Sequence, residues 1–470
     1  MEVHVFENQS ARPACSAICA SNAGRENRDQ IPIDLVVDGG VALTMVEDQE
    51  PVMNSRILVS NGRIVAIGRK RDLTIPNGLS YELLDATDCL VMPGLINAHA
   101  HTAMTIFRGV SDDLPLKRWL FEKIFPLEKE FLSSDTVYWG ALLGCLEMIS
   151  SGTTCFADGY FFQDQTAMAA DAAGLRGIIA QGIIDFPAPG VPDPKENIAV
   201  GQRFIQRWKG KSELITPGLF CHSPLTCSEK TLSDAWDLSR EHHLPLQMHL
   251  SETREEVEVI LSNTKRRPVD YLEGLGLLTD QLVVSHAIHL SHEEIALLAK
   301  RGVGVVHVPE SNMKLGSGVA NISRMLSCGM DVGLGTDGCS SNNNLDLLCE
   351  MDSAAKLSKV FERNPASMKA RETLKMATLG GASVLGLKNE IGSLEKGKMA
   401  DMIVIDLKRP HLWPVYNPFS TVVYSANGSD VRDVIVNGRI LMKNRDFMNL
   451  DSSEIMCRVR EISRRIARFF

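Results

Sequence analysis

Two histidines separated by a single residue end the stretch LVMPGLINAHAHT, residues 90–102. The apolar run before them is typical of a buried strand, and every second side chain of a strand points to the same face. His99 and His101 could therefore direct both imidazoles at one point, and neutral imidazole is a common ligand for zinc and similar divalent metals. The alternative is ordinary polarity at a strand end. Further candidate ligands elsewhere in the chain are needed to distinguish a metal site from ordinary strand-end polarity.

Two more candidate ligands follow apolar runs later in the chain. His249 comes after LPLQM, and Asp337 comes after VGLGT. Three histidines, one aspartate and a water would make an open catalytic metal site rather than a closed structural one. A single histidine at a strand end is more often a hydrogen-bonded core residue. Four such side chains at strand ends favour a metal site.

Glu252 lies three residues after His249. A carboxylate there could move protons between a metal-bound water and a ring nitrogen of a substrate. The alternative is that Glu252 only stabilises a helix start, where its negative charge would interact favourably with the dipole of a helix beginning near Thr253. Both roles can hold at once, and we favour the catalytic one.

Other polar side chains near strand ends are weaker candidates for contacts with the substrate or with a metal-bound water. His286 ends the run LVVS, in reach of a metal-bound water, and His222 follows LITPGLFC, where it could bond a substrate hydroxyl or ring edge. His289 and His292 come later, on a loop and a first helical turn, and are expected to be solvated. Glu128 in PLEKEF is by itself most simply part of an exposed helical face.

The elements that carry these residues alternate between short apolar strands and helical stretches. Eight β/α units predict a (β/α)8 TIM barrel, whose active site lies at the carboxyl ends of its strands. A Ser-x-x-Glu capping box, Ser291 to Glu294, marks one helix start, and residues 228–243 predict another helix. The eight apolar runs lead to His99, Gly159, Asp185, His222, His249, His286, Pro309 and Asp337.

Strand-like segments flank the predicted barrel on both sides. Asn61-Gly62 and Asn437-Gly438 each separate two apolar runs, which is a hairpin signal. We expect the two flanks to form one small β-sandwich. The predicted order is a polar N-terminal extension at 1–31, sandwich at 32–92, barrel at 93–396, sandwich again at 397–450 and a C-terminal helix at 451–470.

Composition limits the class of partner. The chain has 470 residues, 44% of them hydrophobic, and a net charge of −9, which argues against nucleic acid or an anionic membrane as the main partner. The N-terminus lacks the pattern of a secretory signal. Eleven cysteines without CxxC spacing suit reduced thiols in the cytoplasm. We expect a cytoplasmic enzyme with a small-molecule substrate, and a homo-oligomer stays open.

Several catalytic motifs are missing from the sequence. It has no GxxxxGK[ST] phosphate loop and no nucleophile elbow. It also lacks the HxE with PCxxC pattern of one class of zinc nucleoside deaminases.

The assembled motifs resemble the amidohydrolase superfamily and, within it, the 5-methylthioadenosine/S-adenosylhomocysteine deaminase family, with triazine hydrolases as close relatives. The resemblance covers residues 33–450. HxH and TDG mark only the superfamily, and WLFEKIFPLE, HLSET and SNMKLGSG are more specific. The supporting stretches are PGLINAHAHTAMTIFRG, WLFEKIFPLEKEF, CHSPLTCS, MHLSET, SHAIHL, SNMKLGSG and GTDGCSSNNNLDLLCEM.

This resemblance implies a hydrolytic deaminase with one Zn²⁺ per subunit. It implies that Glu252 and Asp337 handle protons and that His286 orients the hydrolytic water. Glu128 matches a residue that grips ribose hydroxyls, and His222 matches a substrate-contacting histidine. The implied metal ligands are His99, His101, His249 and Asp337.

One position departs from the family pattern. Gln181 stands where the resemblance leads us to expect an arginine that meets the tail of the substrate, and the following residues FPAPGVPDPKEN supply none. This weakens the case for S-adenosylhomocysteine, whose carboxylate needs a cationic partner. Methylthioadenosine and adenosine stay open.

Two alternatives compete with an adenine-nucleoside deaminase that yields an inosine-type product and ammonia. The first is an amidohydrolase acting on another aminated or chlorinated heterocycle, such as a triazine, a pterin or a guanine derivative. Glu128 and His222 argue against it, because a ribose needs polar anchors. The second is a barrel kept only for assembly, which would be expected to lose ligands that this chain retains.

Overall fold

The computed structural model describes residues 32–75 and 78–469. The chain divides into two units, Met1–Pro32 and Ile33–Phe470, and every element below belongs to the second. The predicted polar extension at 1–31 lies outside the described residues. Within the described ranges, no helix combines the length and apolar character needed to cross a membrane.

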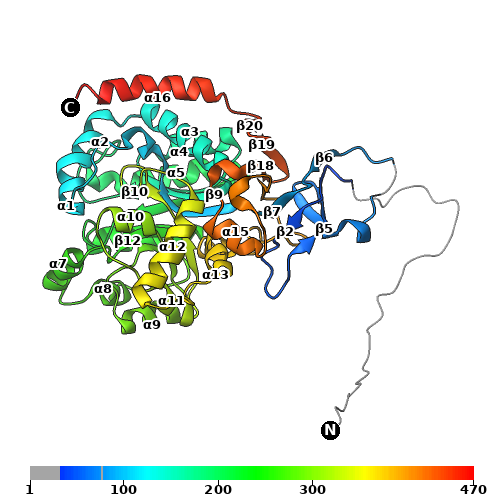
Figure 1. Cartoon of the computed structure of the whole chain (residues 1–470). Coiled ribbons are helices and arrows are strands. Elements are labelled where there is room, and N and C mark those ends of the chain that lie inside the picture. Colours follow the sequence, from blue (N-terminus) through cyan, green and yellow to red (C-terminus); the bar gives the residue numbers. More distant parts are fainter. Residues whose placement is uncertain (1–31, 76–77, 470) are drawn as a thin grey trace, which may run out of the picture. The chain divides into compact units, whose positions relative to one another are not determined.

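The central element is a closed parallel barrel, as predicted (Figure 1). Its sheet order is β15-β14-β13-β12-β11-β10-β9-β8-β16. The strands are β8 (Leu95–His101), β9 (Thr153–Tyr160), β10 (Arg176–Ile183), β11 (Ile215–Cys221), β12 (Leu246–Leu250), β13 (Leu282–His286), β14 (Gly304–His307), β15 (Val332–Leu334) and β16 (Asp337–Gly338).

The barrel closes through the two-residue break between β15 and β16. Gly335 N donates to His307 O on one side, at 2.9 Å, and Thr336 N donates to His99 O on the other, at 3.1 Å. Asn97 of β8 stabilises this closure of the barrel, because its Nδ2 donates to Thr336 Oγ1 at 2.8 Å. The eighth predicted strand is therefore one segment that borders both β14 and β8.

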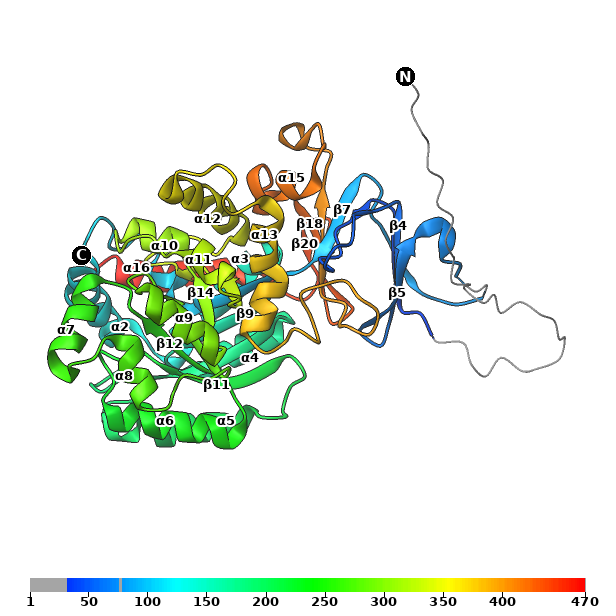
Figure 2. The ribbon, with the colours of Figure 1, turned by 90° about the horizontal axis from the view of Figure 1, so that it is seen from below.

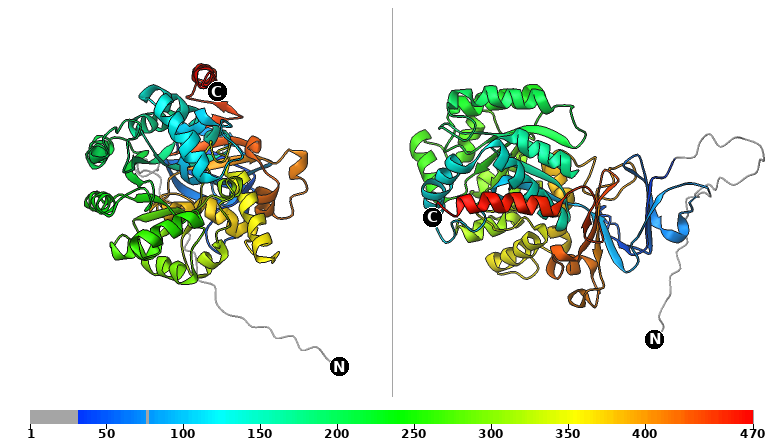
Figure 3. Two further views of the ribbon diagram at one scale, coloured as in Figure 1. Left: turned by 90° about the vertical axis from the view of Figure 1, so that its left-hand side faces the viewer. Right: turned by 90° about the horizontal axis from the view of Figure 1, so that it is seen from above.

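Helices surround the strands, as the left panel of Figure 3 shows end-on. Ser228 caps α6, and the predicted capping box of Ser291 and Glu294 starts α9. The helices after each strand are α3 (Ser134–Ser150), α4 (Gln163–Ala173), α5 (Asn197–Trp208), α6 (Glu229–His242), α7 (Arg254–Thr264), α8 (Pro268–Gly274), α9 (His292–Arg301), α10 (Pro309–Lys314), α11 (Ile322–Ser327), α12 (Leu347–Glu362), α13 (Ala370–Lys375) and α14 (Gly381–Val384).

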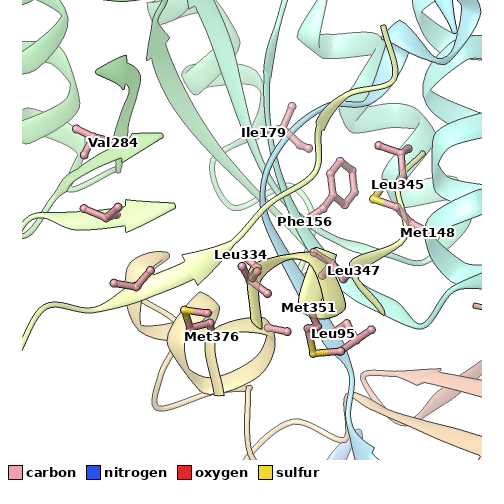
Figure 4. Close-up of a cluster of buried hydrophobic side chains, with 14 of the residues drawn as sticks. Leu95, Met148, Phe156, Ile179, Val284, Leu334, Leu345, Leu347, Met351 and Met376 are labelled. Carbon is pink, nitrogen blue, oxygen red and sulfur yellow. The ribbon is translucent and has the colours of Figure 1, made fainter. Parts of the chain in front are cut away.

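The apolar core fills the space between strands and helices. Figure 4 shows Phe156 and Ile179 from neighbouring strands together with Met148 from α3, and all three are fully buried. Continuous apolar runs such as those in β9 and β10 are what a strand covered on both faces requires.

Two further sheets form the predicted sandwich beside the barrel (Figure 2). Their facing side chains make one buried cluster that includes Leu35, Ile57, Val91 and Val404. One sheet has β5 (Arg63–Arg69), β4 (Ser55–Ser60), β1 (Leu35–Asp38) and β6 (Glu82–Asp85). The other has β20 (Asp446–Phe447), β19 (Arg439–Lys443), β18 (Val431–Val436), β17 (Met402–Asp406), β7 (Cys89–Pro93), β2 (Val41–Ala42) and β3 (Val52–Met53).

Both predicted hairpins are present, β4–β5 and β18–β19. Asn61 and Gly62 have φ of 48° and 73°, and Asn437 and Gly438 have 51° and 71°. A two-residue turn with positive φ at both positions favours Asn-Gly, which explains why the sequence signal was reliable.

A layer of short helices lies over the carboxyl end of the barrel. It consists of η2 (Thr102–Phe107), α1 (Leu116–Arg118), the π-helical turn η3 (Trp119–Ile124) and α2 (Phe125–Phe131). The C-terminal helix α16 (Ser452–Ile466) lies along this side of the molecule (Figure 3, right panel). Ile462 and Ile466 of α16 pack in one cluster with Trp119 and Leu127, so the helix supports the layer that carries Glu128.

Candidate active site

A cavity of about 860 Å³ opens at the carboxyl ends of the barrel strands. This volume lies within the usual range for small-molecule sites. Most of the wall is apolar, and the polar groups gather at its base. Every side chain proposed from the sequence as catalytic or substrate-binding lines it: Glu128, His222, Glu252, His286 and Asp337.

The predicted ligands converge at the base of this cavity. One donor atom each from His99, His249, His286 and Asp337 lies within 4.8 Å of the others. His101 joins them, because its Nε2 is 3.2 Å from Asp337 Oδ1 and 3.3 Å from His249 Nε2. The structure therefore brings the four predicted ligands together, and His286 lies within the same group of converging donor atoms.

The donor set fits a metal ion. His99 Nε2 is buried and has no hydrogen-bond partner, which is costly unless something else occupies its lone pair. Burial lowers the pKa of His99 to about 4 and holds the pKa of His249 well below its usual value, so both rings are neutral at pH 7. His101 Nδ1 lies 2.6 Å from Gly159 O, which fixes the proton there and leaves Nε2 free to ligate.

Asp337 is oriented by two hydroxyl groups. Ser311 Oγ donates to Asp337 Oδ2 at 2.6 Å, and Ser341 Oγ donates to the same atom at 2.8 Å. The other oxygen, Oδ1, faces the histidines. Burial alone would raise the pKa of Asp337, but the close approach of the His101 and His99 rings, whose Nε2 atoms lie 3.2 and 3.5 Å from Oδ1, outweighs it and holds that pKa well below the usual value. Asp337 is thus a carboxylate with one oxygen anchored and one directed at the cluster.

Glu252 points into the cavity beside this cluster. Its Oε2 is 3.8 Å from His286 Nε2, and Ser317 Oγ donates to its Oε1 at 3.3 Å. Burial raises the pKa of Glu252, which favours the protonated form needed in a proton donor. Thr253 caps helix α7, since its side chain accepts from Glu256 N, so Glu252 does not serve as the cap.

His286 is held by one amide side chain. Asn312 Oδ1 lies 2.8 Å from His286 Nδ1, which places the proton on Nδ1 and turns Nε2 toward Glu252 and the ligand cluster. Asn312 follows Ser311 in helix α10. The segment after β14 therefore contributes no candidate metal ligand. It orients Asp337 through Ser311 and His286 through Asn312, and Ser317 of the same segment donates to Glu252.

The interpretation of Glu128 from its local sequence as part of an exposed face was wrong, and the substrate-binding role that the family resemblance implies stays a prediction. Its side chain is only 3% exposed and lines the cavity, whereas its neighbours Lys129 and Glu130 are exposed. Tyr160 Oη donates to Glu128 Oε1 at 2.6 Å. Helix α2 docks over the barrel mouth, and this tertiary contact buries a position that the helical pattern alone assigns to solvent.

His222 lies across the cavity base, with its ring centroid 5.1 Å from that of His249. Its Nδ1 is 2.9 Å from Thr226 Oγ1, so Nε2 is the atom available to a ligand. Burial lowers the pKa of His222 to about 4, which keeps the ring neutral.

His289 was expected to be solvated, but it lines the cavity and its Nε2 contacts Ser317 O at 2.8 Å. His292 is exposed, as expected.

Position 181 does not face the cavity, which contradicts the expectation that it meets the tail of the substrate. Gln181 is buried, its Nε2 donates to Gly182 O at 3.3 Å, and it does not line the cavity, although the adjacent Gly182 does. Cations reach the cavity from other elements instead. Arg254 at the start of α7 and Lys117 of α1 both line it, and Lys117 pairs with Glu255 at 2.7 Å.

Sequence reasoning missed the residues that orient the functional groups. Tyr160, Ser311, Asn312 and Ser341 hold the functional carboxylates and His286. SNMKLGSG was noted as a family marker, and it contains Ser311 and Asn312. Small polar residues of this kind occur at many sites, so their roles appear only once the contacts are known.

The chain was compared with known proteins, and the sequence model of the amidohydrolase family matches residues 90–441. The 5-methylthioadenosine/S-adenosylhomocysteine deaminase of Syntrophobacter fumaroxidans is 46% identical over 433 residues, which cover 92% of this chain and 98% of that protein. The 5'-deoxyadenosine deaminase of Methanosarcina mazei is 41% identical over 426 residues, covering 90% and 96%.

Solved structures share the fold of this chain. A zinc-bound adenosine deaminase from Xanthomonas campestris superposes with a TM-score of 0.90 at 34% identity, covering 93% of this chain and 99% of that one. The atrazine chlorohydrolase of Arthrobacter aurescens shares the fold, with a TM-score of 0.85 at 22% identity over 91% of this chain and all of that one.

The barrel, its cluster of candidate metal ligands and the matching sequence model define a member of the amidohydrolase family, a class of metal-dependent hydrolytic enzymes. Within that class, the chain belongs to the 5-methylthioadenosine/S-adenosylhomocysteine deaminase family. The resemblance found in the sequence motifs is confirmed.

Proposed function

We propose that this enzyme hydrolyses adenine nucleosides at C6 of the base, releasing ammonia and the inosine-type nucleoside. The observation that carries the proposal is the arrangement of one cavity. Glu252 and Asp337 flank the histidine cluster at its base, and Glu128 and His222 stand where a sugar and a base edge would be held. Relatives that act on adenine nucleosides support the same assignment.

One zinc ion is the proposed cofactor. His99, His101, His249 and Asp337 would hold it, and three nitrogens with one oxygen suit zinc. When bound, the ion supplies Lewis acidity, which brings the pKa of a water toward neutrality. The zinc-bound relative supports this choice of metal.

The chain's own residues account for the proton transfers. His286 orients the attacking water, and Asp337 takes a proton from it through the oxygen that faces the cluster. Glu252, protonated, donates to N1 of the adenine as the water oxygen bonds to C6. Asp337 then passes its proton to the amino nitrogen, and the C6–N bond breaks with its electron pair going to that nitrogen, so that ammonia leaves. The remaining proton of the C6 hydroxyl goes to Glu252 as the C6 carbonyl forms, which restores the protonated acid.

The cavity wall supports 5'-substituted nucleosides as substrates. Leu120, Phe121 and Leu225 give it an apolar side that suits a methylthio group, and Arg254 makes no ion pair within the described residues. An unpaired guanidinium is the partner that a homocysteine carboxylate needs. Because Gln181 lies outside the wall, the sequence argument against S-adenosylhomocysteine no longer applies, and we propose both substrates.

A second candidate function is hydrolysis of another heterocycle, such as a triazine. The shared fold of the atrazine chlorohydrolase keeps it open as an alternative, although fold alone does not define the reaction. The buried carboxylate of Glu128 favours the nucleoside, because a triazine has no sugar hydroxyl to donate to it.

We also propose a cytoplasmic location. The nine cysteines within the described residues are all free thiols, which suits a reducing compartment. A homo-oligomer stays a prediction, and sedimentation of the metal-loaded protein tests it.

The proposed function is tested by incubating the zinc-loaded enzyme separately with methylthioadenosine, S-adenosylhomocysteine, adenosine and a chlorotriazine. Ammonia release and the ultraviolet change from adenine to hypoxanthine are followed together, and chloride release is also followed with the triazine. The proposal expects both signals with the nucleosides and neither with the triazine. Activity on the triazine alone would favour the second candidate.

A further inference from the structure

Tyr160 and Glu128 form a buried pair on the cavity wall, and the Tyr160 ring centroid is 5.9 Å from that of the candidate ligand His101. Tyr160 is the last residue of strand β9, and Glu128 comes from helix α2 in the layer over the barrel mouth. The phenol donates to Glu128 Oε1 at 2.6 Å, a short distance typical of a hydrogen bond to a charged acceptor. Tyr160 is 5% exposed and Glu128 is 3% exposed.

The second oxygen of Glu128 is left available. Among the described residues Oε2 has no hydrogen-bond partner, and it is not one of the atoms sealed from solvent. Glu128 itself lines the cavity. The tyrosine therefore occupies one oxygen of the carboxylate and leaves the other to accept from a molecule in the cavity.

The same strand end also holds a metal-ligand candidate. Gly159 O accepts from His101 Nδ1 at 2.6 Å, and the next residue is Tyr160. Two adjacent residues of β9 thus hold two side chains of the cavity, the candidate metal ligand His101 through Gly159 O and the Glu128 carboxylate through Tyr160 Oη. The position of Glu128 relative to the candidate metal ligands is therefore set by one strand end.

We propose that Tyr160 is a positioning residue that presents Glu128 Oε2 to the hydroxyl groups of the substrate's sugar. The inference rests on the proposed function, which assigns sugar recognition to Glu128. Without the phenol, the Glu128 carboxylate has no other donor among the described residues to fix its rotation. Burial raises its pKa to about 7, and the tyrosine acts against that rise, which favours the accepting form.

The test compares adenosine with 2',3'-dideoxyadenosine, which lacks both hydroxyl groups, in the zinc-loaded enzyme. For Tyr160→Phe, kcat/KM for adenosine should fall about tenfold or more, mainly through KM, since a hydrogen bond to a charged group is lost. Its kcat/KM for the dideoxy substrate should stay near that of the unmodified enzyme. Tyr271→Phe, which removes a phenol from helix α8 outside the cavity, is the matched control and should change neither.

A double variant then separates positioning from general stability. If Tyr160 acts through Glu128, Glu128→Gln with Tyr160→Phe should be no worse on adenosine than Glu128→Gln alone. Equal losses on both substrates in Tyr160→Phe, or losses that multiply in the double variant, would overturn the inference while leaving the deaminase assignment intact. An unmodified enzyme that releases no ammonia from adenosine or methylthioadenosine would overturn the proposed function and this inference with it.

Discussion

Replacing Glu252 by glutamine isolates proton transfer from the rest of the site. Glutamine has the same shape, and its side-chain carbonyl can still accept from Ser317 Oγ, which lies 3.3 Å from Oε1. Glu252 is not one of the converging ligand atoms, so metal content should not change. The lost function is the donation of a proton to the base.

The expected loss in kcat is about 10²- to 10⁴-fold, the usual contribution of a general acid, or about 3 to 5 kcal/mol in the barrier. Stability should not fall, because burial raises the pKa of Glu252 and thus disfavours its charged form, whereas glutamine is neutral.

The assay combines ammonia release, metal content and thermal unfolding for Glu252→Gln beside Glu255→Gln. Glu255 is exposed and pairs with Lys117 at the cavity rim, so its replacement should cost little activity. A Glu252→Gln enzyme that keeps activity within a fewfold of the unmodified protein would refute the proton-donor role. Loss of the metal in that variant would show that Glu252 acts on the metal site instead.

Three further predictions follow from named contacts. Arg254→Gln should lower kcat/KM for S-adenosylhomocysteine about tenfold and leave methylthioadenosine unchanged, measured by parallel initial rates; equal effects on both would exclude a carboxylate contact. Asp337→Asn should abolish most turnover and weaken metal retention during dialysis, since it replaces a ligand and a proton acceptor; full metal and full rate would contradict both roles. Burial raises the pKa of Glu128 to about 7. The fraction of Glu128 in the deprotonated form, which accepts hydrogen bonds from the sugar, therefore increases as pH rises from 6 to 8, and KM for adenosine should fall over that range. In Glu128→Gln this pH dependence should disappear, and a flat KM in the unmodified enzyme would contradict it.

The sequence predicted those parts of the fold that depend on local rules. Continuous apolar runs marked the strands because a barrel strand is buried on both faces, and polar side chains at their ends marked the cavity. Asn61-Gly62 marked a hairpin because both residues adopt positive φ. The metal-ligand candidates could be found because histidine and aspartate at the ends of several strands of one predicted barrel form a rare pattern.

Other residues could not be assigned without tertiary contacts. Glu128 lies in a helix whose local pattern suggests exposure, and only the docking of α2 over the mouth buries it. Position 181 was expected to face the tail of the substrate, but neighbouring residues of a strand face opposite sides, and Gly182 is the one that lines the cavity. Arg254 was missed because it enters the wall from α7, more than seventy residues later in the chain.

The most direct test of the central claim is hydrolysis of methylthioadenosine by the zinc-loaded enzyme in water labelled with heavy oxygen, followed by mass spectrometry of the nucleoside. We predict one ammonia released per substrate consumed, and one labelled oxygen at C6 of the product with the sugar unlabelled. A product that retains its nitrogen, or one that carries no label, would contradict hydrolytic deamination at this site.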